Sequence, residues 1–157
     1  MQIRQQQLKQ HLSQQVLPLY VLNGQELYLA MEALDSIKAV LHSRYSCDEV
    51  KLNIQSASDW QELLEQSQNL SLFHDYLLIS AYYDKKSLDA EGKKALTRYL
   101  EKQPSSTCLI LHTPQLPNKA LQWLQNDKNT CIVTSYPLDA AAMKQWIHAR
   151  LKSCNFS

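Results

Sequence analysis

The 157-residue chain is almost neutral, with 16 lysine and arginine residues against 15 aspartate and glutamate residues. Hydrophobic residues make up 45% and charged residues 20% of the sequence, proportions typical of a globular domain rather than of a disordered chain. A domain that binds DNA on its own usually carries a basic excess, because phosphate neutralisation supplies most of the affinity. The composition therefore predicts one domain over residues 1–157 and argues against autonomous DNA binding.

The sequence shows no feature of a membrane or secreted protein. No stretch approaches the roughly 20 consecutive apolar residues that cross a bilayer, and the glutamine-rich residues 1–15 lack the apolar segment of a secretory signal. The four cysteines form no CxxC pair, and Cys108 and Cys131 lie inside apolar runs. We expect reduced, buried thiols in a cytoplasmic protein that does not bind membranes.

Short apolar runs alternate with amphipathic stretches along the chain, and their spacing predicts the secondary structure. In chain order, we expect a helix over 3–15, a strand over 17–22, a helix over 26–43, a strand over 49–54, a helix that starts at a Ser58-Asp59 cap, a strand over 76–81, a helix over 89–103, a strand over 107–111, a short helix over 114–125, a strand over 130–134 and a helix from Asp139 onwards. Five strands alternating with helices predict an α/β fold with a mostly parallel five-stranded sheet, covered by helices on both faces.

The turn after the first strand, Asn23-Gly24, is where many α/β proteins bind phosphate. A phosphate-binding loop of the GxxxxGK[ST] type needs a second glycine, a lysine and a hydroxyl residue. The chain has only two glycines, Gly24 and Gly92, and Leu29 occupies the position five residues after Gly24. The dinucleotide-binding pattern GxGxxG is equally impossible. We therefore predict no nucleotide cofactor.

Other catalytic patterns are also missing from the sequence. The five histidines share no metal-ligand spacing with one another or with the cysteines. No acidic residue closes the strands over 76–81 and 107–111, as magnesium binding would require, and there is no GxSxG elbow. We expect no catalytic residue, no metal and no cofactor. An enzyme stays an alternative, because Tyr82, Tyr83, Asp84 and His112 could meet at the strand ends, where open sheets bind ligands.

One short motif lies between the helix of Trp60 and the strand over 76–81. Residues 68–73 read QNLSLF. The leucines and the phenylalanine could simply pack beneath the helix as it turns into the sheet. Binding residues, however, commonly lie in loops and at helix ends of an α/β scaffold. The candidate binding residues are Gln68, Leu70, Ser71, Leu72 and Phe73.

This motif resembles the one with which bacterial replication and repair proteins enter the hydrophobic groove of the sliding clamp. With its surroundings, the chain resembles the N-terminal domain of the delta subunit of the bacterial DNA polymerase III clamp loader. The resemblance covers the whole order of elements. Its local matches are Gln7-Leu8, the strand over 19–24, Asp59-Trp60, Ser71-Leu72-Phe73, the strand over 108–111, and Trp146 with Ala149-Arg150 in the last helix.

The resemblance implies an ATPase-like (AAA+/RecA-like) domain without a functional phosphate loop. It implies a non-catalytic subunit that binds the sliding clamp (the beta subunit) and helps to open it during DNA replication, with the family's Leu-Phe pair at Leu72 and Phe73 and its serine at Ser71. Other loader subunits would be bound through further domains that residues 1–157 do not include. DNA would be contacted only indirectly, within the complex.

A nucleic-acid-contacting module is a second alternative. Lys93, Lys94, Arg98 and Lys102 could share one helical face, but Glu91 and Glu101 interleave with them. Mixed charges of this kind are more typical of a solvated surface helix.

Overall fold

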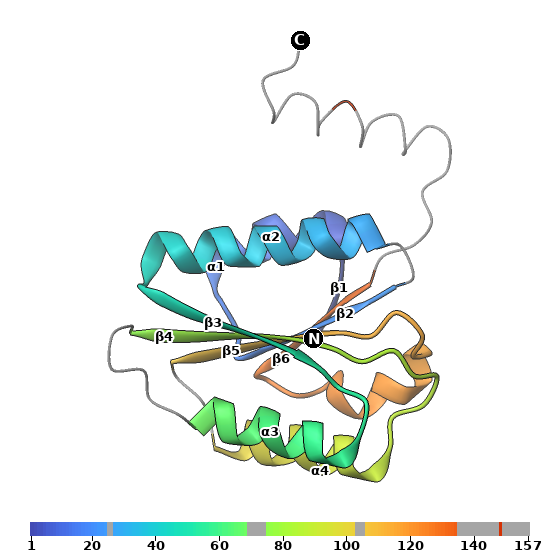
Figure 1. Cartoon of the computed structure of the whole chain (residues 1–157). Coiled ribbons are helices and arrows are strands. Elements are labelled where there is room, and N and C mark those ends of the chain that lie inside the picture. The colour runs from blue at the N-terminus through green and yellow to red at the C-terminus, as the bar shows by residue number, and fades with distance from the viewer. Residues whose placement is uncertain (25–26, 69–74, 103–105, 135–147, 149–157) are drawn as a thin grey trace.

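The protein is an α/β domain built on one parallel sheet (Figure 1). The computed structural model describes residues 1–24, 27–68, 75–102, 106–134 and 148. Six strands form a single sheet in the order β1-β6-β2-β5-β4-β3, and all of their pairings are parallel. The strands are β1 Gln2–Arg4, β2 Leu19–Asn23, β3 Cys47–Asn53, β4 Tyr76–Tyr82, β5 Thr107–His112 and β6 Thr130–Thr134.

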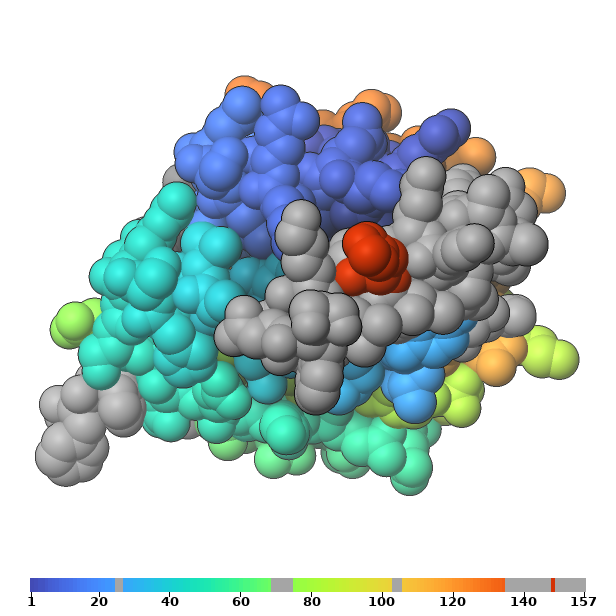
Figure 2. Space-filling view, turned by 90° about the horizontal axis from the view of Figure 1, so that it is seen from above, coloured from blue at the N-terminus to red at the C-terminus, as the bar shows by residue number. Residues whose placement is uncertain are grey.

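Helices cover both faces of this sheet, which gives three layers (Figure 1). The helical elements are η1 Gln5–Gln7, α1 Leu8–Gln14, α2 Leu27–Arg44, α3 Ala57–Gln68, α4 Ala90–Glu101 and η2 Asn118–Leu124, of which η1 and η2 are 3₁₀ helices. α1 and α2 lie side by side on one face, where Figure 2 shows them in blue and cyan. α3 and α4 pack together on the other face.

Two hydrophobic cores separate the layers, because successive side chains of a strand point to opposite faces. In β2, Tyr20 and Leu22 pack beneath α1 and α2, while Leu19 and Val21 pack against the α3 and α4 side. β2 is buried along its whole length, as expected for a central parallel strand. The apolar runs that predicted the five strands are thus explained by burial on two sides.

The predicted fold class is confirmed, but the sheet has six strands instead of five. The helix predicted over residues 3–15 is wrong at its start, because β1 pairs with β6 there, with Ile3 opposite Val133. The Met1 amino group also hydrogen-bonds to the carbonyl oxygens of Gln125 and Thr130, at 2.6 and 3.1 Å. Pairing with β1 supplies hydrogen-bond partners for backbone groups along the edge of β6, which would otherwise be open. A three-residue strand is too short for its spacing to be seen in the sequence.

The helix starts were predicted with mixed success. The helix predicted from Asp89 begins one residue later, at Ala90, and Asp89 is its cap, since its Oδ1 accepts a hydrogen bond from the Gly92 N–H at 2.7 Å. The Ser58-Asp59 cap is wrong: α3 begins at Ala57, and the Asp59 carboxylate instead reaches back to the N–H groups of Gln55 and Ser56.

Two further predictions concern the end of the chain. The short helix expected over 114–125 is the 3₁₀ helix η2. The helix expected from Asp139 lies outside the described residues, except for His148.

The thiols at Cys108 and Cys131 are buried and unpaired, as predicted, and burial raises the pKa of the Cys131 thiol to about 12. Within the described part of the chain, no helix is long and apolar enough to cross a membrane. No three His, Cys, Asp or Glu side chains among the same residues are grouped to bind a metal.

Candidate partner-binding site

The predicted motif is bracketed by the end of α3 and the start of β4. Gln68 is the last residue of α3 and is exposed. Leu70, Ser71, Leu72 and Phe73 lie in the 69–74 segment, outside the described residues, and the chain resumes at Asp75. The described structure therefore includes the two residues that flank the motif, Gln68 at the end of α3 and Asp75 before β4.

Both ends lie at the amino edge of the sheet, where its parallel strands begin. α3 runs back from the carboxyl edge after β3, and β4 starts where α3 has ended (Figure 1). Open α/β sheets usually bind small ligands at the opposite, carboxyl edge. The two residues that flank the motif, Gln68 and Asp75, therefore lie away from the place where a nucleotide would be expected.

The entry end of the motif is fixed by the packing of α3. Trp60 and Leu63 are buried one helical turn apart and anchor α3 to the core shared with α4. In its last turn, the Ser67 hydroxyl donates a hydrogen bond to the Leu64 carbonyl at 2.7 Å. This bond ties the Ser67 side chain to the backbone of the last turn, and Gln68 follows as an exposed residue.

The exit end of the motif is fixed by the turn between α2 and β3. The Ser46 carbonyl accepts hydrogen bonds from the N–H groups of both Asp75 and Tyr76, at 3.0 and 3.1 Å. Beside it, the Tyr45 ring stacks on the Tyr76 ring, with centroids 4.7 Å apart and planes 13° apart. Sequence reasoning missed both Tyr45 and Ser46, because a backbone acceptor has no residue signature and Tyr45 belongs to no motif.

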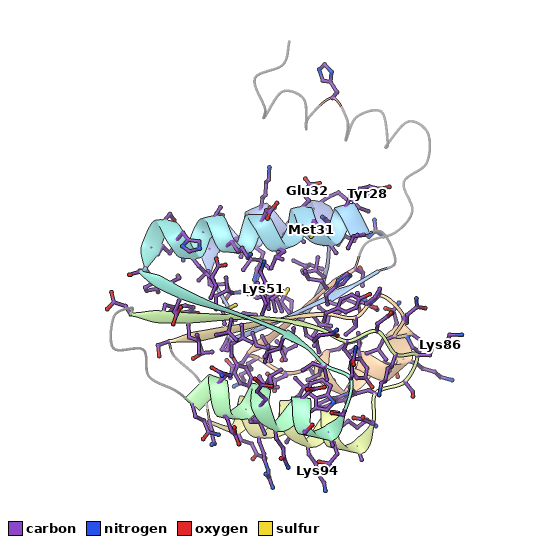
Figure 3. All side chains as sticks on the ribbon, in the orientation of Figure 1. Tyr28, Met31, Glu32, Lys51, Lys86 and Lys94 are labelled. Carbon is purple, nitrogen blue, oxygen red and sulfur yellow. The ribbon has the colours of Figure 1, made fainter. Side chains whose placement is uncertain are left out.

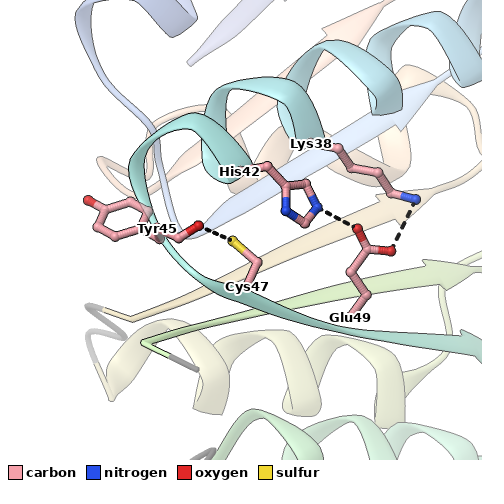
Figure 4. Close-up of polar contacts among 5 residues, drawn as sticks. All are labelled: Lys38, His42, Tyr45, Cys47 and Glu49. Carbon is pink, nitrogen blue, oxygen red and sulfur yellow. Dashed lines mark hydrogen bonds and ion pairs between the residues drawn. The ribbon is translucent and has the colours of Figure 1, made fainter. Parts of the chain in front are cut away.

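A small ion network ties the last turns of α2 to β3, close to that turn (Figure 4). His42 Nε2 lies 2.8 Å from Glu49 Oε1, and Lys38 Nζ lies 3.6 Å from Glu49 Oε2. The hydrogen bond from His42, together with the Lys38 charge, lowers the pKa of the Glu49 carboxyl below its ordinary value. The network holds the carboxyl end of α2 against the first residues of β3.

At the carboxyl edge, the last residue of β2 is bound by other protein groups. Asn23 is buried, and its amide nitrogen, in the orientation that satisfies its surroundings, donates to the carbonyls of Thr113 and Leu116 at 2.9 and 3.0 Å. Leu29, which stands where a phosphate loop would have its second glycine, is buried in α2. Asn23 and Leu29 thus pack against other protein groups at the positions where a phosphate-binding loop would have groups that contact phosphate. This packing is consistent with the lack of a glycine-rich pattern in the sequence.

Three of the four residues proposed for an enzyme alternative come together at this edge. The rings of Tyr82 and His112 meet edge to face, with centroids 5.3 Å apart. Burial and the Asp84 charge raise the pKa of Tyr82. Burial lowers the pKa of His112, against the opposing effects of a hydrogen bond with the Gly24 backbone and of the Asp84 charge. Tyr83 does not join them, because its ring packs on Trp60 and its hydroxyl donates to the Ser87 carbonyl at 2.6 Å.

The comparison with protein families decides the assignment. The family model described as "DNA polymerase III, delta subunit" matches residues 20–136, more than half of the chain. The chain belongs to this family. The prediction made from the sequence resemblance is thereby confirmed at the level of the family.

A similar protein is the DNA polymerase III subunit delta of Haemophilus influenzae (strain ATCC 51907 / DSM 11121 / KW20 / Rd). It is 24% identical over 154 residues, which cover 94% of this chain and 44% of that protein. The chain thus spans less than half the length of this delta subunit. Among solved structures, a similar one is the crystal structure of a DNA replication initiation factor, which is 14% identical in sequence. The match covers 97% of this chain and 50% of the chain in that structure, with a TM-score of 0.45. The family membership rests on the sequence match.

The family match to the delta subunit includes both ends of the candidate site, since Gln68 and Asp75 fall inside residues 20–136. It also includes α4, whose cations Lys93, Lys94 and Arg98 are all exposed. Figure 3 shows Lys94 projecting from the outer side of α4, and its ammonium lies 4.0 Å from Glu91. The mixed charge expected for a solvated surface helix is therefore present on this delta-family chain.

Proposed function

We propose that this chain is the clamp-binding domain of a delta subunit, which binds the sliding clamp and helps to open it during DNA replication. The observation that carries the proposal is the motif QNLSLF at residues 68–73 of a delta-family chain. Leu72 and Phe73 are the two apolar anchors, and Gln68, Leu70 and Ser71 complete the contact. The amino edge of the sheet supports this role, because it presents the motif between two ends that the fold holds in place.

Two adjacent apolar anchors suit a partner that must be gripped and later released. Each side chain contributes roughly 1.5–3 kcal/mol if it becomes fully buried. Association and side-chain ordering then remove part of that gain. Binding would thus depend on a few residues, as in other interfaces dominated by hot spots. The exposed amide of Gln68 offers a donor and an acceptor to a polar pocket nearby.

Clamp opening follows from differential binding. A partner that binds the open ring more tightly than the closed ring shifts the population toward the open ring. The 69–74 segment leads directly into β4, which pairs on both sides with β3 and β5. A strand held between two neighbours gives the Leu72-Phe73 wedge a rigid support.

The domain has a supporting and not a catalytic role in this proposal. In this proposal, the fold is that of an ATPase-like domain without a functional phosphate loop. The two glycines of the chain are too few to form such a loop, and the Asn23 amide at the end of β2 bonds to protein carbonyls. It needs no cofactor. Other parts of a longer subunit would bind the remaining loader subunits, since the chain covers 44% of its H. influenzae relative, and DNA would be reached through the complex.

The test is calorimetric titration of the chain with purified bacterial sliding clamp. We expect saturable binding by the wild type and at least a tenfold loss of affinity in the double variant Leu72→Ala with Phe73→Ala, which corresponds to about 1.4 kcal/mol or more. The matched control is Leu27→Ala with Met31→Ala, because both side chains are exposed on α2, far from the amino edge. That variant should bind like the wild type.

Two results would contradict the proposal. A folded wild type that does not bind the clamp would leave the chain as a delta-family domain with another role. Equal affinities in the wild type and a folded Leu72/Phe73 variant would mean that binding uses another surface.

A further inference from the structure

β3 forms one outer edge of the sheet and pairs with a single strand, β4 (Figure 1). In a parallel ladder, every second residue directs both its N–H and its C=O group to the same neighbouring strand. The Ser46 carbonyl accepts from the Tyr76 N–H at 3.1 Å, and the Ile54 N–H donates to the Tyr82 carbonyl at 2.8 Å. The even-numbered residues therefore face β4. The odd-numbered residues of β3 direct their backbone groups away from the sheet, and these are Cys47, Glu49, Lys51 and Asn53.

These outward backbone groups make the edge of β3 an open one. In the described part of the chain, the N–H and C=O groups of Glu49, Lys51 and Asn53 bond to no other strand or loop. β3 is seven residues long, whereas β1, at the opposite edge of the sheet, has three. A row of unpaired groups on a strand of this length is a template for one more strand.

Opposite charges lie two residues apart along this edge, on the face that α2 covers. Glu49 points to that face, because it contacts Lys38 and His42 of α2 at 3.6 and 2.8 Å (Figure 4). Lys51 shares the face, since alternate residues of a strand lie on the same side. It is exposed, and no carboxylate of the described residues lies within ion-pair distance of its ammonium. The lysine is thus available to a carboxylate from outside the chain.

An identical strand from a second copy fits this edge in one register. Two copies related by a two-fold axis pair their edges antiparallel, and outward groups must meet outward groups, so only odd-numbered residues form hydrogen-bonded pairs. Full overlap of the two strands puts Val50 on the axis and Glu49 opposite Lys51 of the second copy. A slip to the next allowed register puts Glu49 opposite Glu49 or Lys51 opposite Lys51, and like charges directly opposite are destabilising. The charges therefore favour the register with the most hydrogen bonds.

We propose that the edge of β3 is a self-association surface, at which a second copy of this chain pairs antiparallel about Val50 and two symmetry-related Glu49–Lys51 pairs fix the register. Charged side chains on an edge strand usually discourage pairing. Here their order attracts an identical strand and disfavours its slipped registers. On the opposite face, the half-buried Val50, which packs against the core beneath α3, meets its counterpart. The sheet then continues through both copies, independently of clamp binding.

Sedimentation equilibrium of the chain tests this proposal. We expect a monomer–dimer equilibrium with a dissociation constant of roughly 10⁻⁴ M, because one strand pair is a small interface. Lys51→Glu places like charges opposite each other in both pairs and should weaken association at least about tenfold, as should Glu49→Lys. Lys94→Glu is the matched control, because it makes the same change in net charge at an exposed position of α4 (Figure 3). It should associate like the wild type.

An equimolar mixture of the two weakened variants separates lost pairing from damaged folding. The Lys51→Glu copy carries carboxylates at both positions, and the Glu49→Lys copy carries ammonium groups at both. Their mixture again has opposite charges in both pairs, so a heterodimer should form with an affinity within about threefold of the wild type. A mixture of Lys94→Glu with Glu49→Lys has the same net charges but one repulsive pair, and it should associate more weakly.

Hydrogen exchange distinguishes strand pairing from association through another surface. In the proposed dimer, the outward amides of Glu49 and Lys51 become hydrogen-bonded, while the amides of Val50 and Leu52 bond to β4 with or without a second copy. Raising the protein concentration through the dissociation constant should therefore slow exchange at Glu49 and Lys51, and leave Val50 and Leu52 unchanged.

Three results would overturn the inference. The first is a chain that stays monomeric at several times the expected dissociation constant. The second is a dimer that Lys51→Glu and Glu49→Lys do not weaken, and the third is association without slower exchange at Glu49 and Lys51. None of these results bears on clamp binding, and a failure to bind the clamp would leave self-association standing.

Discussion

Gly92 lies in the first turn of α4 and faces the core instead of solvent. A Cβ atom at this position would lie 2.8 Å from Leu88 Cδ1, 2.9 Å from Trp60 Cζ2 and 3.0 Å from Asp89 Oδ1. The leucine end can move aside, but the Trp60 ring is fully buried and rigidly packed. The Asp89 carboxylate is also occupied, because it caps α4 through the Gly92 N–H. The close approach of α4 to α3 thus depends on a residue without a side chain.

Gly92→Ala therefore tests whether helix propensity or packing dominates at this position. Propensity alone would stabilise the variant by up to about 1 kcal/mol. Overpacking against Trp60 costs about 1–3 kcal/mol, so we expect a net loss of unfolding free energy, measured by urea denaturation. Arg98→Ala, at an exposed position of the same helix, is the control and should change stability by less than about 0.5 kcal/mol. A more stable Gly92→Ala would mean that α4 moves away from Trp60 without cost.

Single residues also show what the sequence could predict and what it could not. The start of α4 was predictable to within one residue, because a helical pattern begins at Asp89. Ser46 was not, because its role comes from a carbonyl oxygen that every residue has. The Leu72-Phe73 prediction rests on a motif whose residues lie outside the described part of the chain, and it stays a prediction.

At the scale of elements, the contact between α2 and β3 depends on pH through Glu49. Lys38 and His42 face its carboxylate from α2. On its own strand, Cys47 and Lys51 lie two residues away on the same face, and Asp48 is adjacent. His42 and Lys38 lower the folded-state pKa of Glu49 below its ordinary value of 4.5. A depressed carboxyl pKa gives stability that is present above the unfolded-state value and is lost as pH falls through the folded-state value.

We therefore expect the wild type to exceed Glu49→Gln in unfolding free energy at pH 6, and this difference to disappear as the pH falls below 4.5. The difference should be small, because the Glu49 side chain is 34% exposed and its ion pairs are screened by solvent. Urea denaturation at pH 6, 5, 4 and 3 measures it, with 0.5 M salt as a second condition that should reduce it. A difference that does not change with pH would exclude the ion network as its source.

The pairing of elements was predictable only where burial leaves a pattern. Central strands such as β2 and β5 appear as apolar runs because helices cover both of their faces. β1 escaped prediction because its three residues are placed by the edge of β6, more than a hundred residues further along the chain. Likewise, η2 was expected as an ordinary helix, since its buried Leu121 and Leu124 are three residues apart and fit both helix types.

At the scale of the whole molecule, the charge of the sequence is nearly balanced. The exposed cations of α4 lie between Glu91 and Glu101, and the Lys94 ammonium lies 4.0 Å from the Glu91 carboxylate. Lys86 lies in the loop after β4, on another side of the molecule from Lys94 (Figure 3). The formal net charge is +1. A protein of this kind gains little from counterion release, which supplies most of non-specific DNA affinity.

We expect the chain alone to bind a 20-base-pair duplex no more tightly than the non-specific range of roughly 10⁻⁴ to 10⁻⁶ M at physiological salt. Fluorescence anisotropy between 50 and 200 mM salt measures both the affinity and its salt slope. Since the slope is about −0.9 per neutralised phosphate, a shallow slope between zero and about −2 is expected. The charge-reversal variant Lys93→Glu with Lys94→Glu should abolish what binding there is, while clamp affinity stays unchanged because α4 does not carry the motif. Submicromolar binding with a slope of about −5 or steeper would instead mean that α4 is part of a DNA-binding surface.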